Sequence, residues 1–405
     1  MGRDGRVKTG TEAIAPDLVW LFDVLWGGRT GVRHTPGPTS SGAGYVAIPS
    51  ARRARAFVPG DRLAARAALA SGAQARSGGS RRARAVASRM VGSAVSRAVF
   101  RDRFWVDGDD PLLDAVGAAL GERPVAFAAA VRRPGPFRKP VLQAVTPDGR
   151  VVGYAKVAWN AVTATNVRAE HAALVLLADA GVTAPRGPAP VGLLDHRGFP
   201  VLVTRPMPER LRRYDASDGP PPPPISRVVA SLPLPSGADP DPIGARLRER
   251  FDEARGPALP HVQRALEILL AGVTERTGML PAGAWHGDWS SWNLGWVGEQ
   301  LWAWDWEYSR ADVPIGLDLP HFTFQQRFIA DRSPVQIAFA DARAASAAGL
   351  ATLGYDAAAR SVLLAVHVAE VSLRYLEAEV AGVAANPRFL AGGAEALRAA
   401  TEALS

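Results

Sequence analysis

Short apolar runs separated by turn residues mark the middle of the chain. They lie at residues 125–131, 141–146, 151–159, 189–194 and 200–204. Runs of this length, rich in valine, are typical of β-strands, and the sequence PDGR at residues 147–150 is a good turn between two of them. An apolar stripe at helical spacing over residues 166–180 falls between the strands. The block 124–205 is therefore predicted to be an antiparallel sheet with one inserted helix.

The second half of the chain is predicted to be mostly helical. Residues 243–279 and 325–405 are rich in Ala and Leu at helical spacing, whereas residues 285–307 carry loop and strand signals. Residues 214–242 contain five consecutive prolines, Pro220–Pro224. We predict an irregular loop there, because proline lacks the backbone N–H that helices and sheets need. A sheet followed by helices is the α+β class.

The first quarter of the chain has a different texture. Residues 45–58 predict one or two short strands, residues 71–80 a linker, and residues 81–104 a helix with many arginines. This basic helix either packs on the next domain or binds a membrane surface or a phosphate polymer. The expected regions are a basic N-terminal region at 1–105, a sheet-based lobe at 106–207 and a helical lobe at 208–405.

Composition narrows the class of protein. Of the 405 residues, 47% are hydrophobic and 21% are charged, as in ordinary globular domains. The chain has no long uninterrupted apolar stretch and no apolar core near its start, so we expect a cytoplasmic protein without a membrane span. The absence of cysteine excludes disulfides, thiol nucleophiles and thiolate metal sites.

The formal net charge of +8 is unevenly distributed. Residues 1–105 hold 18 Lys or Arg against 6 acidic residues, whereas residues 106–405 hold 29 against 33. The basic character thus belongs to the first quarter, and the part of the chain that carries the motifs below is slightly acidic. We therefore do not expect a nucleic acid as the ligand of that part.

The most informative segment is residues 285–319. In it, the tripeptide His-Gly-Asp that ends at Asp288 precedes Asn293, then Asp305, and then a Gly-Leu-Asp-Leu sequence that contains Asp318. The apolar runs 294–297 and 301–304 predict two strands joined by a three-residue loop that contains glycine. Pairing these strands brings their outer ends together, and Asn293 and Asp305 stand at those ends.

The residues at these strand ends suit a hard metal ion. An amide oxygen beside a carboxylate is a ligand pair that Mg²⁺ accepts, with water and phosphate oxygens completing its shell. Asp288 lies on the loop that enters the hairpin, where a second carboxylate can orient a substrate hydroxyl and accept its proton. Each of these residues taken alone is typical of turns, but the ordered set predicts phosphoryl transfer at a magnesium site.

A second set of residues lies upstream. The chain holds only three lysines among 47 basic residues, and one of them, Lys156, stands in the middle of a predicted strand, where Lys is disfavoured. Glu170 shares the apolar face of the next helix with Val167 and Leu174, and a carboxylate on a buried face needs a partner. We predict that Lys156 pairs with Glu170 and is thereby held against nucleotide phosphates; the alternative is two unrelated surface charges.

On these motifs, over about residues 120–400, the chain resembles the aminoglycoside/choline-kinase-type phosphotransferase family. The resemblance implies a bilobal protein-kinase-like fold, with a small antiparallel-sheet N-lobe and a mostly helical C-lobe. It also implies transfer of the γ-phosphate of ATP, or alternatively GTP, with Mg²⁺ to a hydroxyl of a small molecule such as a sugar, an amino alcohol or an aminoglycoside. The first 105 residues match nothing in this family and form an extra N-terminal region.

The same resemblance implies roles for the residues of the helical lobe. Asp288 would be the catalytic base, and Asn293 and Asp305 would hold Mg²⁺. His286 and Asp318 would be structural, with Asp318 anchoring the catalytic loop.

The resemblance also implies where the nucleotide binds. Lys156 would contact the ATP phosphates and Glu170 would brace it. Residues 203–207 (VTRPM), with Val203, Arg205 and Met207, would form the hinge that contacts adenine through backbone groups.

Two features leave alternatives open. The loop expected over the phosphates, residues 132–139 (RRPGPFRK), has one glycine and two prolines in place of a Gly-x-Gly-x-x-Gly pattern, a signature that members of this family often lack. Either charge from Arg132, Arg133 or Lys139 takes over, or the chain is a catalytically weak kinase-like scaffold that binds nucleotide. Seven of the eleven tryptophans lie within residues 285–306; they pack in a core, or Trp289 or Trp292 faces a cationic or sugar-like acceptor.

Overall fold

The computed structural model describes residues 14–27, 32–36, 44–74, 102–106, 110–124, 126–232, 243–257, 259–384 and 386–404. The chain divides into two compact units. Unit 1 comprises Met1–Ala164 and Val191–Pro206, and unit 2 comprises Thr165–Pro190 and Met207–Ser405. Helix α6 (Ala161–Asp179) begins in unit 1 and continues in unit 2.

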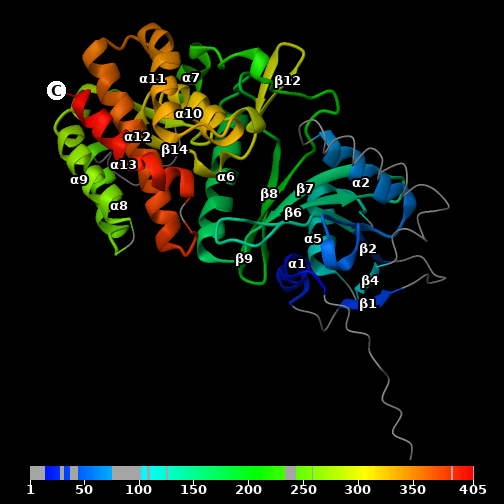
Figure 1. The fold of residues 1–405 in the computed structure, drawn as a ribbon. Helices are drawn as coiled ribbons and strands as arrows, with labels where there is room; N and C mark the ends of the chain where they lie inside the picture. Colours follow the sequence, from blue (N-terminus) through cyan, green and yellow to red (C-terminus); the bar gives the residue numbers. More distant parts are fainter. Residues whose placement is uncertain are drawn as a thin grey trace, which may run out of the picture. The chain divides into compact units, whose positions relative to one another are not determined.

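Unit 1 is built on a nine-stranded sheet with the order β1-β4-β2-β3-β5-β6-β7-β9-β8 (Figure 1). Its strands are β1 (Val32–Pro36), β2 (Tyr45–Ile48), β3 (Ala56–Pro59), β4 (Asp102–Val106), β5 (Ala126–Ala130), β6 (Val141–Val145), β7 (Val151–Val157), β8 (Pro190–His196) and β9 (Phe199–Thr204). The strand pairs from β1/β4 to β7/β9 run antiparallel. The predicted antiparallel sheet with one inserted helix is therefore confirmed.

The turn between β6 and β7 follows from its residues. Gly149 has a φ of 80°, which glycine adopts without a steric penalty, and its N–H donates to the Thr146 carbonyl over 3.0 Å. The Thr146 N–H donates in turn to the carbonyl of Arg150 over 2.9 Å. This closes the hairpin at the predicted turn and sets the register in which Val141 lies opposite Lys156.

The described part of residues 1–105 adds strands and helices to unit 1. Strand β3 pairs with β5 through Ala56 and Ala130, so this part of the chain continues the sheet of the predicted N-lobe. Helices α1 (Pro16–Trp26), α2 (Arg62–Gln74) and α5 (Pro111–Leu120) and the short helix η2 (Ala51–Arg53) complete the unit. Buried aromatic rings of α1, β3 and β4 contact one another in its core; they are Phe22, Phe57 and Phe104.

Two predictions in this region are partly wrong. The predicted helix at 81–104 ends in strand β4, because Phe104 and its alternate neighbour Asp102 turn inward in the two-residue period of a strand. The predicted linker begins with the last residues of helix α2, at 71–74. Residues 75–101, with the rest of the linker and the basic helix, lie outside the described residues.

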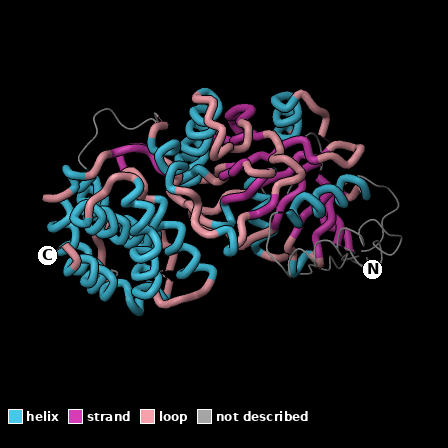
Figure 2. The backbone as a smooth tube through the Cα atoms, turned by 90° about the horizontal axis from the view of Figure 1, so that it is seen from above, coloured by secondary structure: helices cyan, strands magenta, loops and turns pink. Residues whose placement is uncertain are grey.

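Unit 2 is mostly helical, as predicted (Figure 2). Its helices are α7 (Pro223–Ala230), α8 (Ile243–Glu253), α9 (Pro260–Thr274), α10 (Asp318–Gln325), α11 (Val335–Thr352), α12 (Ala357–Val380) and α13 (Pro387–Glu402), with the short helices η3 (Ala216–Asp218), η4 (Thr277–Met279), η5 (Ser291–Asn293) and η6 (Trp306–Tyr308) and the π-helix η7 (Gln326–Ala330). Helices α8, α9, α12 and α13 lie side by side around a shared apolar core (Figure 1). The predicted α+β class is confirmed.

The proline-rich segment is more regular than predicted. Helix α7 starts at the end of the proline run, with Pro223 and Pro224 in its first turn. Those positions have no intrahelical partner for a backbone N–H, and the fixed φ of proline suits the start of a helix. The prediction overlooked that prolines which interrupt a helix interior also favour a helix start.

Two small sheets in unit 2 carry the site loops. One has the order β10-β12-β13, from β10 (Arg212–Arg213), β12 (Leu294–Val297) and β13 (Gln300–Ala303). The other pairs β11 (Ala282–Trp285) with β14 (Arg310–Pro314).

Within the described ranges, no helix is long and apolar enough to cross a membrane.

Candidate active site

A tight turn after strand β11 presents Asp288. Gly287 has a φ of 85°, and a Cβ atom added there would lie 2.2 Å from the carbonyl oxygen of Tyr308. Only glycine accepts both this backbone conformation and this close approach. The turn follows the buried Trp285, whose burial fixes the end of the strand from which the turn starts.

His286 connects this turn to the loop after β13 through two hydrogen bonds. Its Nδ1 accepts the backbone N–H of Asp288 over 3.1 Å, so Nε2 carries the proton and donates to the carbonyl of Trp304 over 3.1 Å. Burial lowers the pKa of His286 to about 4, which keeps the ring neutral and both bonds in place. The predicted structural role of this histidine has a physical basis in these bonds.

Asp318, the first residue of α10, anchors the same turn. Its carboxylate accepts the backbone N–H groups of His286 and Gly287 over 2.8 and 3.2 Å. Burial raises the pKa of Asp318 to about 7, although both N–H groups and the Arg374 charge act to lower it. The two N–H groups would otherwise be buried donors without an acceptor.

Asp288 and Asn293 are in direct contact. The Asn293 side-chain nitrogen lies 3.0 Å from the backbone carbonyl oxygen of Asp288 and 2.7 Å from its Oδ2. Both of these oxygens are acceptors, so the amide must turn its NH₂ group toward Asp288. Its oxygen Oδ1 is then the atom that remains to bind a cation.

Asp305 stands across the hairpin from Asn293. Strands β12 and β13 pair Leu294 with Ala303, and the Trp304 N–H donates to the Asn293 carbonyl over 3.1 Å. Asp305 follows directly, with a φ of 63° and a ψ of 54°, a left-handed conformation that is uncommon outside glycine and often found at functional sites. The hairpin thus brings the two strand ends together as the spacing predicted.

The loop of this hairpin is shorter than predicted. Val297 pairs with Gln300, so two residues form the loop where three were expected. Gly298 has a φ of 60° at the first loop position, where a type II′ turn takes glycine. Because Gln300 pairs with Val297, it is the first residue of β13 and not part of the loop.

Burial and charge act on the Asp288 carboxyl together. Its side chain is 24% exposed. Desolvation raises the pKa of Asp288 above its ordinary value, and the Asp305 charge raises it further. The charges of His286 and Arg374 and the hydrogen bond from Asn293 oppose this rise. Asp305 is therefore close enough to Asp288 for their charges to interact.

The donor set fits a hard divalent cation. The amide oxygen of Asn293 and the carboxylate of Asp305 are oxygen ligands of the kind that Mg²⁺ prefers. Among the described residues, no cluster of three or more His, Cys, Asp or Glu side chains could hold a metal by itself. A cation here would need further oxygens from phosphate and water, as is usual for Mg²⁺.

Two buried histidines near Asp288 were missed by the sequence analysis. His321 on α10 has its Nε2 3.8 Å from Oδ1 of Asp288, and its Nδ1 lies 3.4 Å from Nε2 of His367 on α12. Burial lowers the pKa of His321 to about 3, so the ring is a neutral neighbour of the carboxylate. The signal was its position one helical turn after Asp318, on the same face of α10.

Arg374 was also missed. It donates from Nη1 to the Gly287 carbonyl over 2.6 Å, from a helix 87 residues further along the chain. No local motif surrounds it, and only the packing of α12 brings it to the turn.

The predicted nucleotide residues occupy both units. Lys156 lies in β7 opposite Leu202, and Val203 is fully buried in β9, with the exposed Arg205 directly after that strand. In unit 2, Glu170 of α6 is 1% exposed, as its place on the apolar face predicted, and Met207 is half-buried. The pairing of Lys156 with Glu170 stays a prediction.

The loop at residues 132–139 is held by hydrogen bonds that its carbonyl groups accept. Trp159 donates from Nε1 to the Arg138 carbonyl over 2.6 Å, and Asn160 donates from Nδ2 to the Pro136 carbonyl over 2.9 Å. The Arg138 N–H donates to the Gly135 carbonyl over 2.9 Å. The loop is therefore fixed in place by the two side chains that directly precede α6.

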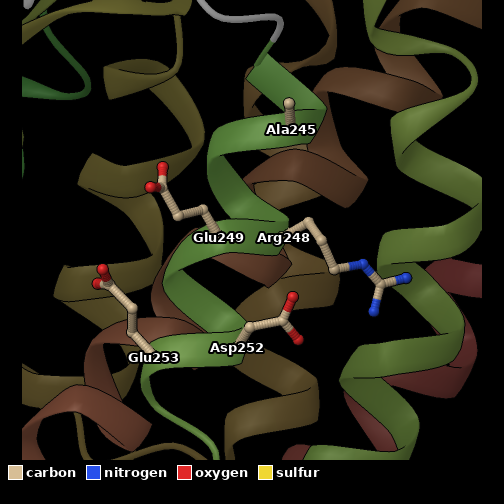
Figure 3. A pocket seen from close by; sticks show the side chains of 5 residues that line it. All are labelled: Ala245, Arg248, Glu249, Asp252 and Glu253. Carbon is tan, nitrogen blue, oxygen red and sulfur yellow. The ribbon is translucent and has the colours of Figure 1, made fainter.

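A shallow hollow lies apart from these residues along helix α8. Figure 3 shows its lining side chains, which all come from α8: Ala245, Arg248, Glu249, Asp252 and Glu253. None of them is a predicted site residue. The partly buried Arg250 of the same helix instead pairs with the buried Glu370 of α12.

Several solved structures are similar to this chain. A choline/ethanolamine kinase family protein from Mesorhizobium loti matches with 18% identity and a TM-score of 0.41, over 72% of this chain and 94% of that one. A thermostable mutant of an aminoglycoside phosphotransferase, in complex with ADP and hygromycin B, matches with 9% identity and a TM-score of 0.49, over 72% of this chain and 98% of that one. An ethanolamine kinase from Plasmodium vivax matches with 12% identity and a TM-score of 0.43, over 68% and 81%.

No protein-family model and no curated protein sequence matches the chain. These three solved structures each cover about 70% of the chain.

Proposed function

We propose that this protein transfers the γ-phosphate of ATP to a hydroxyl group of a small molecule, with Mg²⁺ as the metal. The observation that carries the proposal is the orientation of Asn293. Its amide nitrogen binds Asp288 twice, which leaves its oxygen for a cation and ties the metal ligand to the neighbouring carboxylate. A base and a metal ligand in contact are what phosphoryl transfer to a hydroxyl requires.

The proposed step uses Asp288 as the base. Its carboxylate orients the acceptor hydroxyl and takes its proton, while the hydroxyl oxygen forms a bond to the γ-phosphorus. The bond from that phosphorus to the bridging oxygen of ADP breaks, and ADP leaves with the electron pair. When bound to Asn293 and Asp305, Mg²⁺ would neutralise charge on the phosphate oxygens. The raised pKa of Asp288 suits a group that must hold a proton after the transfer.

The nucleotide contacts are proposed from the sequence pattern. Lys156 would meet the phosphates, Glu170 would brace it, and the backbone near Val203, Arg205 and Met207 would bind the base of ATP or GTP. The acceptor is proposed as a sugar, an amino alcohol or an aminoglycoside-like compound.

A second candidate is a kinase-like scaffold that binds nucleotide with little turnover. The loop at 132–139 favours it, because one glycine stands there in place of a glycine-rich sequence whose backbone N–H groups could approach the phosphates. The complete set Asp288, Asn293 and Asp305 favours the enzyme.

The test is ADP release in a panel of hydroxylated small molecules, with Asp288→Asn as the variant and Asp252→Asn as the matched control. Asp252 lies on the exposed hollow of α8, so the control makes the same chemical change away from the site. We expect Asp288→Asn to lose turnover by at least about a thousandfold while Mg·ATP still binds, because a missing base removes about 10²- to 10⁴-fold of rate and the amide adds a misplaced donor. Equal turnover in wild type and Asp288→Asn would refute the assigned base, and tight Mg·ATP binding without turnover in wild type would support the scaffold.

A further inference from the structure

Three arginines surround the buried Glu370 of helix α12, and one of them, Arg374, also contacts the candidate site. Glu370 is 2% exposed, and its Oε2 lies 2.7 Å from Nη1 of Arg250 and 2.7 Å from Nη2 of Arg310. Its Oε1 lies 3.4 Å from Nε of Arg374, one helical turn further along α12. A carboxylate this deeply buried is stable in the ionised form only with such partners. The contact with Glu370 therefore helps to hold Arg374 in place.

Arg374 reaches from this cluster to the turn that presents Asp288. Its guanidinium lies over the Trp285 ring at 4.8 Å and over the Tyr308 ring at 5.1 Å from their centroids. Its Nη1 donates to the Gly287 carbonyl over 2.6 Å, a charge-assisted bond. One side chain thus contacts the turn after β11 and the loop after β13.

The bond to Gly287 acts on the peptide group that carries Asp288. The carbonyl of Gly287 and the N–H of Asp288 belong to the same planar unit. Arg374 holds the carbonyl end of that unit, and Nδ1 of His286 holds the N–H end over 3.1 Å. With both ends held, rotation of the plane is restrained, and so is the position of the Asp288 Cα atom from which the side chain leaves the backbone.

We propose that Arg374 is a positioning residue for the phosphotransfer reaction, which holds the Gly287–Asp288 peptide plane and thereby aims the Asp288 carboxylate. This inference rests on the proposed function and extends it to a residue outside the loop motifs. Arginine suits the task better than lysine, because its planar fork binds Glu370 and the carbonyl at once while its faces stack on aromatic rings.

Arg250 provides the matched control for this role. It donates to the same Glu370 carboxylate and to Glu377, so its loss also removes one of the partners of the buried charge. In either variant, Arg374→Met or Arg250→Met, two arginines remain on Glu370. A loss of stability is therefore expected in both variants, whereas a loss of loop position is expected only in Arg374→Met.

The first measurement is steady-state kinetics of the full chain with Mg·ATP and the best acceptor of the panel. Arg374→Met should lower kcat by about 10- to 100-fold, because a misplacement of about 1 Å costs a factor of that order, while KM for ATP changes little. Arg250→Met should keep kcat near the wild-type value, although its thermal stability should fall about as much as that of Arg374→Met. Arg374→Lys, which keeps the charge beside Glu370, serves if Arg374→Met does not fold, and it should show the same loss of kcat.

The second measurement is amide hydrogen exchange of peptides that cover residues 285–290, which needs no turnover. Exchange should be faster in Arg374→Met than in Arg250→Met, because the turn opens when the carbonyl bond is lost. Equal exchange in both variants, or wild-type kcat in Arg374→Met, would overturn the positioning role. Absence of ADP release in the wild type would count against the proposed function, and the exchange result would then still decide whether Arg374 holds the turn.

Discussion

At the residue scale, the site depends on single atoms that only one residue type can supply. Asn293 is needed for its two different ends, one that donates to Asp288 and one that would bind the proposed cation. Gly287 is needed for having no Cβ, because the Tyr308 carbonyl occupies that place. These requirements explain why a short motif can identify the site from sequence.

The first prediction concerns Gly287→Ala. The added methyl group meets a backbone carbonyl at 2.2 Å in a left-handed conformation, so the turn must shift and Asp288 with it. We expect a loss of kcat of about a hundredfold or more, measured by ADP release. Gly382→Ala is the control, because Gly382 has a φ of 79° but open space around it. A Gly287→Ala variant as active as Gly382→Ala would show that the close approach does not matter.

The sequence predicted that the strand ends with Asn293 and Asp305 meet, because the spacing of a hairpin indicates which residues face each other across it. It missed His321 and Arg374 because both reach Asp288 or its turn through the packing of long helices. Helical spacing indicates which residues share a face, but it does not say which turn of a distant helix lies opposite a given loop.

At the element scale, the sequence predicted the central strands and their turn correctly. It was less accurate about where helices begin and end. The β6/β7 turn and the strands of the central sheet lie where the pattern placed them. The proline run was predicted to be irregular and instead starts α7, and Phe104 was assigned to a helix and lies in β4. In both cases the local pattern fitted two structures, and tertiary packing decided between them.

Helix α12 supplies the second prediction, a pH dependence of stability. Burial opposes the ionised form of Glu370, but Arg250, Arg310 and Arg374 hold the pKa of Glu370 well below its ordinary value of 4.5. A group with a lowered folded-state pKa stabilises the fold above its unfolded-state pKa, and this contribution disappears as the pH falls through the folded-state pKa. We therefore expect the cluster to contribute fully at pH 7 and progressively less below about pH 4.5.

The measurement is the midpoint of urea unfolding for wild type and Glu370→Gln between pH 7 and pH 3. Glu370→Gln should be less stable at pH 7 by about 3 kcal/mol, because three partly buried arginines lose their shared counter-charge. The difference should shrink toward pH 3. Glu249→Gln, on the exposed hollow of α8, should match the wild type throughout. A difference between wild type and Glu370→Gln that stays constant with pH would contradict the account.

At the scale of the whole molecule, the first quarter of the chain belongs to the sheet of unit 1. Strand β3 pairs with β5, and the rings of Phe22, Phe57 and Phe104 share a core with residues of β6 and β7. The sequence could not predict this pairing, because no turn links β3 to β5 and the strands are far apart along the chain.

The third prediction follows from that pairing. A chain that starts at residue 107 would expose the edge of β5 and the apolar surface that Phe57 and Phe104 cover. We expect it to be recovered mostly as aggregate, measured by size-exclusion chromatography beside the full chain. A monomeric, cooperatively unfolding product would show that the described strands before residue 107 are dispensable for the fold.

The central claim is that Asn293 and Asp305 together hold a divalent cation, and Mn²⁺ binding tests it most directly. Electron paramagnetic resonance with a non-hydrolysable ATP analogue should show Mn²⁺ bound by the wild type and by Asp252→Asn. Binding by Asn293→Leu and Asp305→Asn should be weaker by about tenfold or more, because each loses one protein ligand and Mg²⁺-type sites have few. Mn²⁺ bound equally well by Asn293→Leu, Asp305→Asn and the wild type would contradict the account.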